Sequence, residues 1–445
     1  MLDSHQKRTE GFNEEAMKRH SFYGGKIQTV PKVPIDGMED FSIYYTPGVA
    51  EPCRAIKADK EKVFDLTNKW NTVAIVSDGT RVLGLGDIGP EAGLPVMEGK
   101  ALLFKYLGGV DAVPICLGTK DPDEIIQAVK WLQPSFGGIN LEDISQPKCF
   151  YILDTLRKEM EIPVWHDDQQ GTAAVILAGF INALMIVGKE IEKAKIAFIG
   201  SGAANVAIMR ILFAAGVESS NCVVVDSKGI LHKGRNDIEK AQKEFPDKWN
   251  FCQNTNPDSR TGSIEQAMKG TDVCIALSKS GPGVILPDWV KTMNKNSIVF
   301  ACANPTPEIW PEEAKNAGAK IVATGRSDFS NQVNNSLGFP AIFRAALDVR
   351  AKTITDEMCI AAAVALAQFA QNRGIHENNI LPTMREKEAF IGEAVQVALM
   401  AQEQGVARVK RTRLELQNNA KKMIDEAQKT VDILMKKKII KRSGE

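Results

Sequence analysis

Hydrophobic and polar positions follow three different patterns along the chain. Up to about residue 160, short apolar runs are separated by loops rich in glycine and proline, such as YYTPGVAEP and LGLGDIGPEAGLP. From residue 162 to about residue 325, apolar runs of strand length alternate with stretches of helical periodicity; the runs are KIAFIG, CVVVD, DVCIAL, SIVFACA and KIVATG. Repeated strand–helix–strand units predict a parallel sheet covered by helices on both faces.

The third pattern begins near residue 331 and is helical to the end of the chain. It contains an alanine-rich stretch from Ile360 to Ala370 and then a polar loop with Pro382. The final 30 residues carry apolar positions at helical spacing together with many lysines. The lysines indicate either a solvated helix face or a site for an acidic partner, and we expect the solvated face.

One apolar stretch, Thr172 to Val187, raises the question of a membrane span. It is short for a span, contains Asn182 and is rich in alanine and glycine, so it predicts a buried helix instead. The 55 basic and 55 acidic side chains balance, which gives no electrostatic basis for binding nucleic acid or an anionic membrane.

The compartment is inferred from the cysteines and the first residues. Eight cysteines are scattered without a CxxC pair, so neither a zinc knuckle nor a dithiol redox motif is supported, and we expect buried, reduced thiols. The charged N-terminal stretch does not have the pattern of a secretory signal. We therefore expect a cytoplasmic protein.

A glycine turn between a strand and a helix predicts a dinucleotide site. In IAFIGSGAAN an apolar strand leads into a turn and then a helix of small residues, whose N-terminus favours a pyrophosphate. Asn205 stands where a third glycine is usual, and an ordinary strand–helix turn is the alternative. Asp226 closes the next strand 21 residues after Asn205, where an acid would meet the ribose. The candidate cofactor residues at the turn and the acid are Gly200, Ser201, Gly202, Ala203, Ala204 and Asp226.

Two pairs of carboxylates end short apolar segments. Glu142 and Asp143 lie in GINLEDIS, and Asp167 and Asp168 lie in VWHDDQQGTAA. Helix capping explains either pair alone. Together, beside a dinucleotide fold, their oxygens favour a site for Mg²⁺ or Mn²⁺.

Three other side chains are candidates for chemistry. Arg81 in SDGTRVLGLGDIG has the geometry to clamp a substrate carboxylate, although a lone arginine is usually a surface residue. Lys100 heads a helix-like run with few charges, where a desolvated lysine can act as a base, although most lysines are solvated. His166 precedes Asp167, and we expect a structural role for it.

Nine motifs in order resemble the malic enzyme family. They are YYTPGVAEPCRAI, SDGTRVLGLGDIG, PVMEGKALLFKYLGGVDAVPICL, NLEDIS, HDDQQGTAAV, GSGAAN, DSKG, CANPTPE and NQVNNSLGFPAIFRAAL. They span residues 40 to 346, with further similarity to about Met400, and the chain is similar to the short, bacterial-like branch. The resemblance implies an α/β fold with a substrate domain at 1–160, a Rossmann-like parallel-sheet NAD(P)-binding domain at 161–385 and a helical C-terminal segment at 386–445.

The resemblance also assigns roles to single residues. It implies that Tyr45 is the general acid and that Lys100 is the general base, with Asp167 as its hydrogen-bonded neighbour. The implied metal ligands are Glu142, Asp143 and Asp168, and the implied malate-binding residues are Arg81, Asn304 and Asn335. The implied cofactor residues are those of the glycine turn together with Asp226, Ser227, Lys228 and Asn304.

The implied activity is metal-dependent oxidative decarboxylation of L-malate to pyruvate and carbon dioxide, with NADP or NAD as cofactor and Mg²⁺ or Mn²⁺ as metal. Ser227 and Lys228 follow Asp226 and favour NADP, with a further positive charge from Lys233 or Arg235. We expect a homodimer or a higher homo-oligomer.

A malolactic or oxaloacetate-decarboxylating relative with the same site is the alternative. A non-catalytic dinucleotide-binding regulator would not need the catalytic residues. An amino-acid dehydrogenase would not need the clustered carboxylates.

Overall fold

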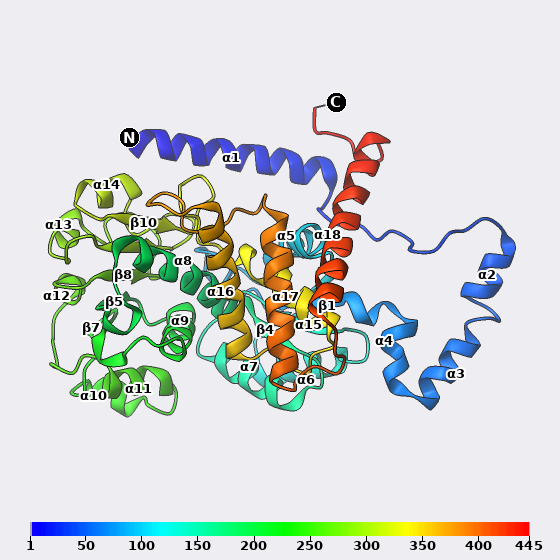
Figure 1. The fold of residues 1–445 in the computed structure, drawn as a ribbon, viewed down its shortest axis with the longest axis horizontal. Helices are drawn as coiled ribbons and strands as arrows, with labels where there is room; N and C mark the ends of the chain where they lie inside the picture. Colours follow the sequence, from blue (N-terminus) through cyan, green and yellow to red (C-terminus); the bar gives the residue numbers. More distant parts are fainter. Residues whose placement is uncertain (1, 445) are drawn as a thin grey trace.

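Two parallel sheets organise the protein in the computed structural model, which describes residues 2–444 (Figure 1). The first sheet has the strand order β2-β1-β3-β4 and consists of β1 (Thr72–Ser77), β2 (Asp111–Cys116), β3 (Gly138–Leu141) and β4 (Val164–His166). The second has the order β10-β9-β8-β5-β6-β7 and consists of β5 (Ile196–Ile199), β6 (Cys222–Asp226), β7 (Gly229–Ile230), β8 (Val273–Ala276), β9 (Ile298–Ala301) and β10 (Ile321–Thr324). Among the strands of residues 2–444, only β7 runs antiparallel to its neighbour.

The five strand-like runs predicted from the sequence are confirmed, because they form β5, β6, β8, β9 and β10. Their register is that of a parallel sheet, as the strand–helix alternation predicts. β4 pairs with β3, so the first sheet extends beyond residue 160 and ends at His166.

Helices cover both sheets. Beside the first sheet lie α5 (Pro90–Gly108), α6 (Pro122–Leu132) and α7 (Lys148–Glu159). The middle of the chain forms α8 (Thr172–Val187), α9 (Ala203–Ala214), α10 (Asn236–Lys240), α11 (Pro246–Asn254), α12 (Ile264–Met268), α13 (Pro287–Val290) and α14 (Pro311–Asn316). The C-terminal part forms α15 (Phe339–Asp348), α16 (Asp356–Arg373), α17 (Lys387–Glu403) and α18 (Arg413–Lys436). Short helical turns that bear on the site are η2 (Asn68–Asn71), η3 (Asp167–Gly171) and η6 (Asn335–Leu337).

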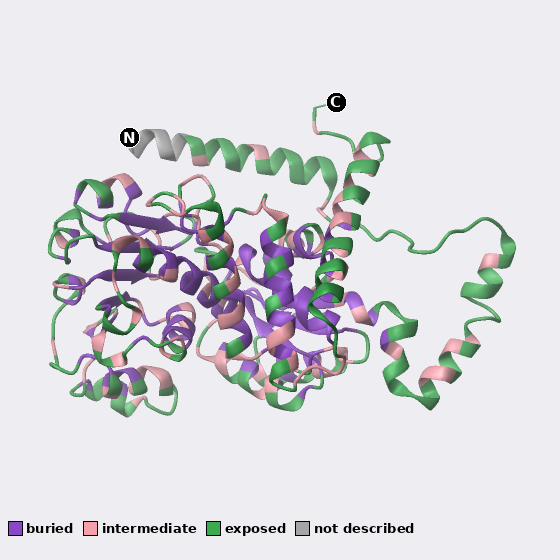
Figure 2. Ribbon diagram, in the orientation of Figure 1, coloured by how far each residue is buried: buried purple, intermediate pink, exposed green. Residues whose placement is uncertain are grey.

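One hydrophobic core runs continuously between the two sheets. It joins side chains of β1 and β5 through α8, α15, α16 and α17, whereas the outer face of each sheet has a smaller core of its own. Figure 2 shows this buried interior in purple. Because α8 lies inside the shared core, the apolar stretch that begins at Thr172 is a buried helix, as predicted. Together with η3 it forms the stretch Asp167–Val187, which is long and apolar enough to cross a membrane by length and composition only, and most of which is buried.

The lysine-rich end of the chain forms α18, which buries one face and exposes the other. Leu416, Ala420, Ile424 and Ala427 are buried, whereas the lysines between Lys421 and Lys438 are exposed. The expected solvated lysine face is therefore confirmed. Buried positions three or four residues apart explain the arrangement, because they fall on one side of a helix.

The segment before the first sheet is different, since most of its residues are exposed. It contains α1 (Leu2–Tyr23), α2 (Met38–Tyr44), α3 (Ala50–Ala58) and α4 (Val63–Leu66). We call residues 33–58 the arm; none of them is buried, and the arm stands away from the rest of the protein in Figures 1 and 2.

The shared core depends on one buried amide, which gives a stability prediction. Asn182 of α8 donates hydrogen bonds to the carbonyls of Ala367 and Ile380, at 3.1 and 2.8 Å. Asn182→Ala removes both bonds, together with the bond that Asn182 Oδ1 accepts from Gln371 Nε2, so we expect the free energy of unfolding to fall by about 1–3 kcal/mol. Denaturant unfolding measures this change. Asn254→Ala is the control, because the exposed Asn254 side chain bonds only within its own helix, and an equal loss in both variants would contradict the prediction.

Candidate active site

Parallel strands bring the predicted carboxylates to one edge of the first sheet. Glu142 and Asp143 follow β3, and Asp167 and Asp168 follow β4, which pairs with β3 in parallel register. The carboxyl ends of parallel strands meet at the same edge, which is where open α/β sheets place ligands. Two pairs that lie 25 residues apart in sequence are therefore neighbours, with the backbone N–H of Asp143 donating to Asp168 Oδ2 at 2.9 Å.

Glu142, Asp143 and Asp168 form a cluster of candidate metal ligands. One carboxylate oxygen from each lies within 4.8 Å of the others. Glu142 and Asp143 are 2% and 4% exposed, whereas the Asp168 side chain is 36% exposed and leaves the cluster open on one side. Buried Asp143 Oδ2 has no hydrogen-bond partner among the described residues. Three converging oxygen donors and an orphaned oxygen fit Mg²⁺ or Mn²⁺.

Burial and mutual repulsion raise the pKa values of the buried carboxyl groups in the cluster. Burial, and then the Asp168 carboxylate, raise the pKa of Asp143 to about 8. Burial also raises the pKa of Glu142 well above its ordinary value. Carboxyl groups retain protons in this way when their negative charge is neither solvated nor compensated.

Lys100 enters the cluster from α5. Its Nζ forms an ion pair with Asp167 Oδ2 and another, at 3.1 Å, with Glu142 Oε1, and it donates to Asn335 Oδ1 at 3.2 Å. Its ammonium also lies 4.7 Å from the centroid of the Phe339 ring. Burial alone would lower the pKa of Lys100, but the attraction of Asp167, Glu142 and Asp168 outweighs burial and raises it.

The Asp167 side chain is held in place from two sides. Trp165 Nε1 donates to Asp167 Oδ1 at 3.3 Å, and Asp167 is fully buried. The chain makes a wide turn at η3 before α8 begins, a local form that often marks functional sites. Gly171 closes this turn, and a Cβ there would lie 1.9 Å from Asp167 Oδ1. Only glycine therefore allows Asp167 to point at Lys100.

His166 lies beside the cluster, but its side chain forms no hydrogen bond with the residues of the cluster. It is fully buried, its Nδ1 is 3.8 Å from Asp168 Oδ2, and its ring nitrogens have no hydrogen-bond partner among the described residues. Burial lowers the pKa of His166, so the ring is neutral at pH 7. Its expected structural role stays a prediction.

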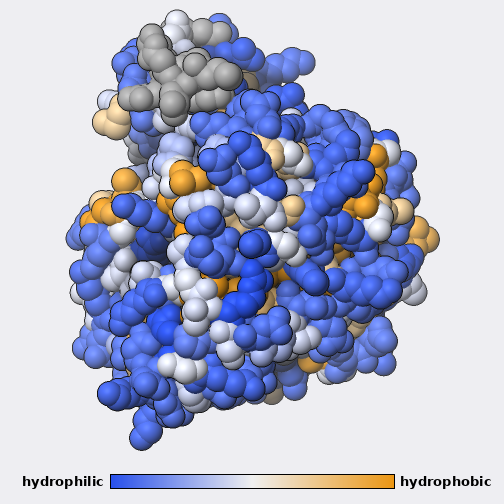
Figure 3. All heavy atoms as spheres, turned by 90° about the vertical axis from the view of Figure 1, so that its left-hand side faces the viewer, coloured by the Kyte–Doolittle hydropathy of each residue, from blue (hydrophilic) through white to orange (hydrophobic). Residues whose placement is uncertain are grey.

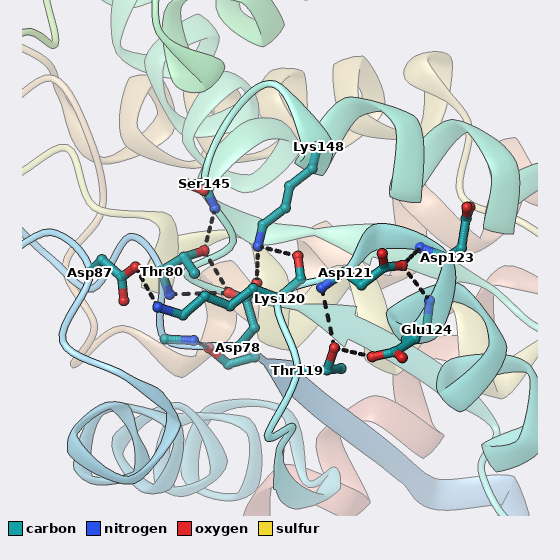
Figure 4. A network of polar contacts seen from close by, with 12 residues as sticks. Asp78, Thr80, Asp87, Thr119, Lys120, Asp121, Asp123, Glu124, Ser145 and Lys148 are labelled. Carbon is teal, nitrogen blue, oxygen red and sulfur yellow. Dashed lines mark hydrogen bonds and ion pairs between the residues drawn. The ribbon is translucent and has the colours of Figure 1, made fainter.

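A polar network fixes the loop that carries Arg81 (Figure 4). Thr80 Oγ1 donates to Asp78 Oδ1 at 2.6 Å and accepts from the backbone N–H of Ser145 at 3.0 Å. Lys148 Nζ donates to the buried Asp78 carboxylate and to the Lys120 carbonyl. The loop after β1 is thus tied to the loop that follows the metal ligands, and the Arg81 N–H donates to the Asp143 carbonyl at 2.9 Å. The Arg81 side chain is exposed beside the cluster.

The sequence analysis missed the roles of Asp78, Lys148 and Trp165. Asp78 follows β1 at the same sheet edge as the other acids, so strand order was a usable signal for it. No sequence signal indicated the roles of Lys148 and Trp165, because their contacts depend on tertiary packing.

Two asparagines reach the site from the second half of the chain. Asn335 in η6 bonds Lys100 directly. Asn304 is exposed, and its backbone carbonyl meets the Arg81 loop, since a Cβ on Gly84 would lie 2.4 Å from that oxygen. The site therefore lies where loops of both sheets touch.

Tyr45 is the one predicted catalytic residue that the fold does not bring to the cluster. It follows α2 on the arm and is 73% exposed. Its hydroxyl makes no hydrogen bond with any other described residue. The remaining predicted catalytic and metal residues are in contact with one another.

The glycine turn after β5 has the geometry of a dinucleotide cradle. Gly200 has φ of +100°, and a Cβ on it would lie 2.8 Å from the Leu277 carbonyl. Gly202 precedes α9 and has open space around it, as close approach of a pyrophosphate to a helix N-terminus requires. Asn205 explains the departure from a third glycine, because its Nδ2 donates to the carbonyls of Ile199 and Gly200 at 3.0 and 2.8 Å. The asparagine thus secures the turn.

The loop after β6 is a balanced network of charges. Arg235 donates to both carboxylate oxygens of Asp226, at 3.1 and 3.0 Å, and forms two further bonds with Asp237. Lys228 Nζ lies 3.2 Å from Asp237 Oδ2, and its side chain is 69% exposed. Ser227 is exposed beside it. Two cations therefore stand beside the predicted ribose-binding acid.

Comparisons with known proteins agree on one family. Residues 24–157 match the family described as "Malic enzyme, N-terminal domain", and residues 169–403 match "Malic enzyme, NAD binding domain". A protein of Bacillus subtilis named "Bifunctional malic/malolactic enzyme" is 48% identical over 400 residues, which cover 89% of this chain and 94% of the relative. The "NAD-dependent malic enzyme" of Geobacillus stearothermophilus is 50% identical over 385 residues, or 86% of this chain and 78% of the relative. The crystal structure of Entamoeba histolytica malic enzyme has a TM-score of 0.95 and 51% identity, and covers 98% of this chain and 90% of that chain.

The carboxylate cluster predicts that metal and protons compete. Because the pKa of Asp143 is raised to about 8, this group carries a proton below that pH, and a binding cation must displace it. We expect the affinity for Mn²⁺ to fall by about tenfold per pH unit below pH 8 for each proton displaced. Calorimetric titration with Mn²⁺ in two buffers of different ionisation enthalpy measures both the affinity and the protons released.

Asp168→Asn tests the same cluster, since it removes one anionic ligand and should weaken Mn²⁺ binding strongly. Asp154→Asn is the matched control, because Asp154 is exposed on α7. Binding of Mn²⁺ that is equally tight at pH 6 and pH 8, or equally weakened by both substitutions, would rule out this cluster as the metal site.

Proposed function

The chain belongs to the malic enzyme family, and on that basis we propose that it catalyses the oxidative decarboxylation of malate to pyruvate and carbon dioxide with reduction of NAD or NADP. The observation that carries the proposal is the contact of Lys100 with Asp167 and Glu142 inside the carboxylate cluster. A cationic side chain, a metal-binding cluster and a dinucleotide fold in one place are what oxidation of a 2-hydroxy acid requires.

Each side chain has a defined task in the proposed reaction. Arg81 and Asn335 hold the carboxylates of malate, and Glu142, Asp143 and Asp168 hold the metal. When bound, the nicotinamide accepts the hydride from carbon 2, and the divalent cation supplies positive charge that stabilises the substrate oxygen and offsets the carboxylates that keep Lys100 protonated.

The proton transfers belong to the chain's own residues. Lys100, aligned by Asp167, takes the proton of the carbon 2 hydroxyl. Loss of carbon dioxide from the resulting 2-keto acid leaves an enolate, and Tyr45 donates a proton to its carbon 3, which gives pyruvate. A reaction with these successive proton transfers is expected to use one group as the acid and another as the base.

Malolactic conversion is a second candidate activity of the same site, because the 48%-identical relative is named as bifunctional. The two activities share the hydride and proton steps and differ in whether reduced cofactor accumulates. Decarboxylation of oxaloacetate, the remaining alternative, requires the metal cluster without the dinucleotide turn.

We further propose that NADP is used at least as well as NAD. The support is the pairing of Asp226 with Arg235, which neutralises the carboxylate that would otherwise repel a 2′-phosphate. Lys228 and Ser227 lie exposed on the same loop and can contact that phosphate. Asn304, which follows β9 of the second sheet, is also proposed to contact the cofactor.

A reducing, cytoplasmic location is also proposed. All eight cysteines are free, and six of them are buried. Unpaired thiols are typical of proteins in a reducing compartment.

The activity is tested by following the absorbance of reduced nicotinamide with malate, Mn²⁺ or Mg²⁺, and NAD or NADP in parallel. We expect reduced cofactor and pyruvate to form in equal amounts, EDTA to abolish turnover and added metal to restore it. Lactate formation without net reduction of cofactor would instead identify the malolactic activity.

Lys100→Ala should lower turnover with malate by about 10²–10⁴-fold, because general base catalysis is lost. The control is Lys105→Ala on the same helix, since Lys105 pairs with Asp111 outside the cluster. Steady-state kinetics with saturating metal measure both variants. Normal turnover in Lys100→Ala would move the base to another residue.

The cofactor loop gives a separate prediction. Lys228→Ala and Arg235→Ala should each raise the Michaelis constant for NADP, by roughly 10–150-fold for a charged hydrogen bond worth ~1.5–3 kcal/mol, and leave that for NAD almost unchanged. Lys243→Ala, at an exposed lysine outside this loop, is the control. Equal effects on both cofactors, or a wild-type protein that ignores NADP, would show that Asp226 alone sets the choice.

A further inference from the structure

One fully buried carboxylate in the second half of the chain, Glu308, has no part in the proposed reaction. The end of the molecule that carries the second sheet has a mainly hydrophilic surface, with apolar residues in small groups (Figure 3). Glu308 is not one of these surface charges, because it is 0% exposed. A carboxylate that is removed from water costs free energy unless hydrogen bonds compensate it. The bonds that Glu308 accepts therefore indicate what it does.

Glu308 joins the two loops that follow β8 and β9. The backbone N–H of Ser278, after β8, donates to Glu308 Oε1 at 2.9 Å, and the backbone N–H of Ala303, after β9, donates to Glu308 Oε2 at 3.0 Å. Further bonds join the same loops, because Ser280 Oγ donates to the Thr306 carbonyl and accepts from the Thr306 N–H, both at 3.1 Å. Burial raises the pKa of Glu308 to about 7, although the N–H groups of Ser278 and Ala303 oppose this rise. One carboxylate thus fixes the spacing of two loops.

The bonds to Glu308 also set the direction of two carbonyls. In a trans peptide the carbonyl of one residue points opposite to the N–H of the next, so the carbonyls of Leu277 and Cys302 point away from Glu308. The Leu277 carbonyl lies against the glycine turn, since a Cβ on Gly200 would be 2.8 Å from its oxygen. The Cys302 carbonyl lies toward the loop after β10, since a Cβ on Gly325 would be 3.3 Å from its oxygen. Both acceptors therefore lie at the carboxyl edge of the second sheet.

This edge is where the strand order places a dinucleotide. The chain passes from β5 to β6 and β7 on one side of the sheet and returns to β8 on the other side of β5. Ligands of open α/β sheets bind outside the carboxyl ends of the strands at such a switch point. The adenosine half belongs over β5 and β6, where the glycine turn and Asp226 lie, so the nicotinamide half belongs over β8 and β9. Asn304, which is proposed to contact the cofactor, directly follows Ala303 in one of the two joined loops.

We propose that Glu308 is a positioning residue of the dinucleotide site, which holds the loops after β8 and β9 at the spacing that the nicotinamide half requires. The inference deepens the proposed function and rests on it, because it assumes that NAD or NADP binds at this edge. A carboxylate suits the task, since both of its oxygens accept and each takes one N–H. The amide of a glutamine accepts at one oxygen only and turns its NH2 group toward the other N–H, so one loop would lose its bond.

Equilibrium binding to Glu308→Gln tests the proposal. Calorimetric titration compares NAD with ADP, and NADP with 2′,5′-ADP, since these two probes carry only the adenosine half. We expect the variant to bind NAD and NADP at least about tenfold more weakly than the wild type does, because a charge-assisted hydrogen bond to one loop is lost. ADP, 2′,5′-ADP and Mn²⁺ should bind as they do to the wild type. An equal loss for the dinucleotides and their adenosine halves would overturn the proposal.

Glu393→Gln is the matched control. Glu393 of α17 is also fully buried, and neither of its carboxylate oxygens has a hydrogen-bond partner among the described residues. This variant therefore measures the effect of removing a buried carboxyl group that joins no cofactor loop, and we expect wild-type affinity for both dinucleotides. A loss as large as that of Glu308→Gln would show that the loops after β8 and β9 have no special role, which would contradict the proposal.

Amide hydrogen exchange gives a readout that does not depend on the cofactor. In Glu308→Gln, peptides that cover residues 277–285 and 302–308 should exchange faster than in the wild type, whereas the loop after β6 should exchange alike in both proteins. Faster exchange of both loops together with wild-type dinucleotide affinity would make Glu308 a purely structural residue and overturn the proposal. Dinucleotide binding by a wild-type protein that does not oxidise malate would contradict the proposed function and not this inference.

Discussion

The excess of negative charge around Lys100 is the constraint on which the rest of the site depends. Glu142, Asp143 and Asp167 are buried, Asp168 lies at the opening, and one ammonium faces all four carboxylates. Buried charges of one sign are costly unless protons or cations compensate them. Lys100 compensates part of the charge, and the raised pKa of Asp143 shows that a proton takes up another part. The same imbalance favours the binding of a divalent cation, which can replace that proton and reduce the hold of the carboxylates on Lys100.

This charge cluster can form only if elements from both halves of the chain keep their positions. Phe104 on α5 packs against Phe339 and Phe343 of α15, with ring centroids 4.6 and 5.2 Å apart. Gly108, at the end of α5, allows the two helices to approach so closely that a Cβ there would lie 2.6 Å from the Pro340 carbonyl. The helix that carries Lys100 is thereby fixed against the helix that follows Asn335. Apolar packing in the shared core thus sets the distance between the base and its amide partner.

The sequence was sufficient wherever a local rule decides the structure. Buried strands have an apolar pattern of their own, so two pairs of acids that each end a short apolar segment could be assigned to one metal site. Contacts that are set by tertiary packing could not be predicted from the sequence. The sequence does not show that Asn205 bonds the Gly200 carbonyl in place of a third glycine, or that Lys148 reaches Asp78. The position of Tyr45 could not be predicted either, because a motif identifies a catalytic residue without showing where the fold places it.

The loop after β6 shows how a motif rule depends on the neighbours of its key residue. An acid at the end of the second strand is associated with NAD because its free carboxylate accepts from a ribose hydroxyl and repels a phosphate. Here the Asp226 side chain is 8% exposed and both of its oxygens accept from Arg235. Two acids and two bases make the network neutral, so the repulsion that the rule assumes is largely absent. A 2′-phosphate would therefore compete with Asp226 for the guanidinium of Arg235, and cofactor choice becomes a question of which anion this arginine binds more tightly.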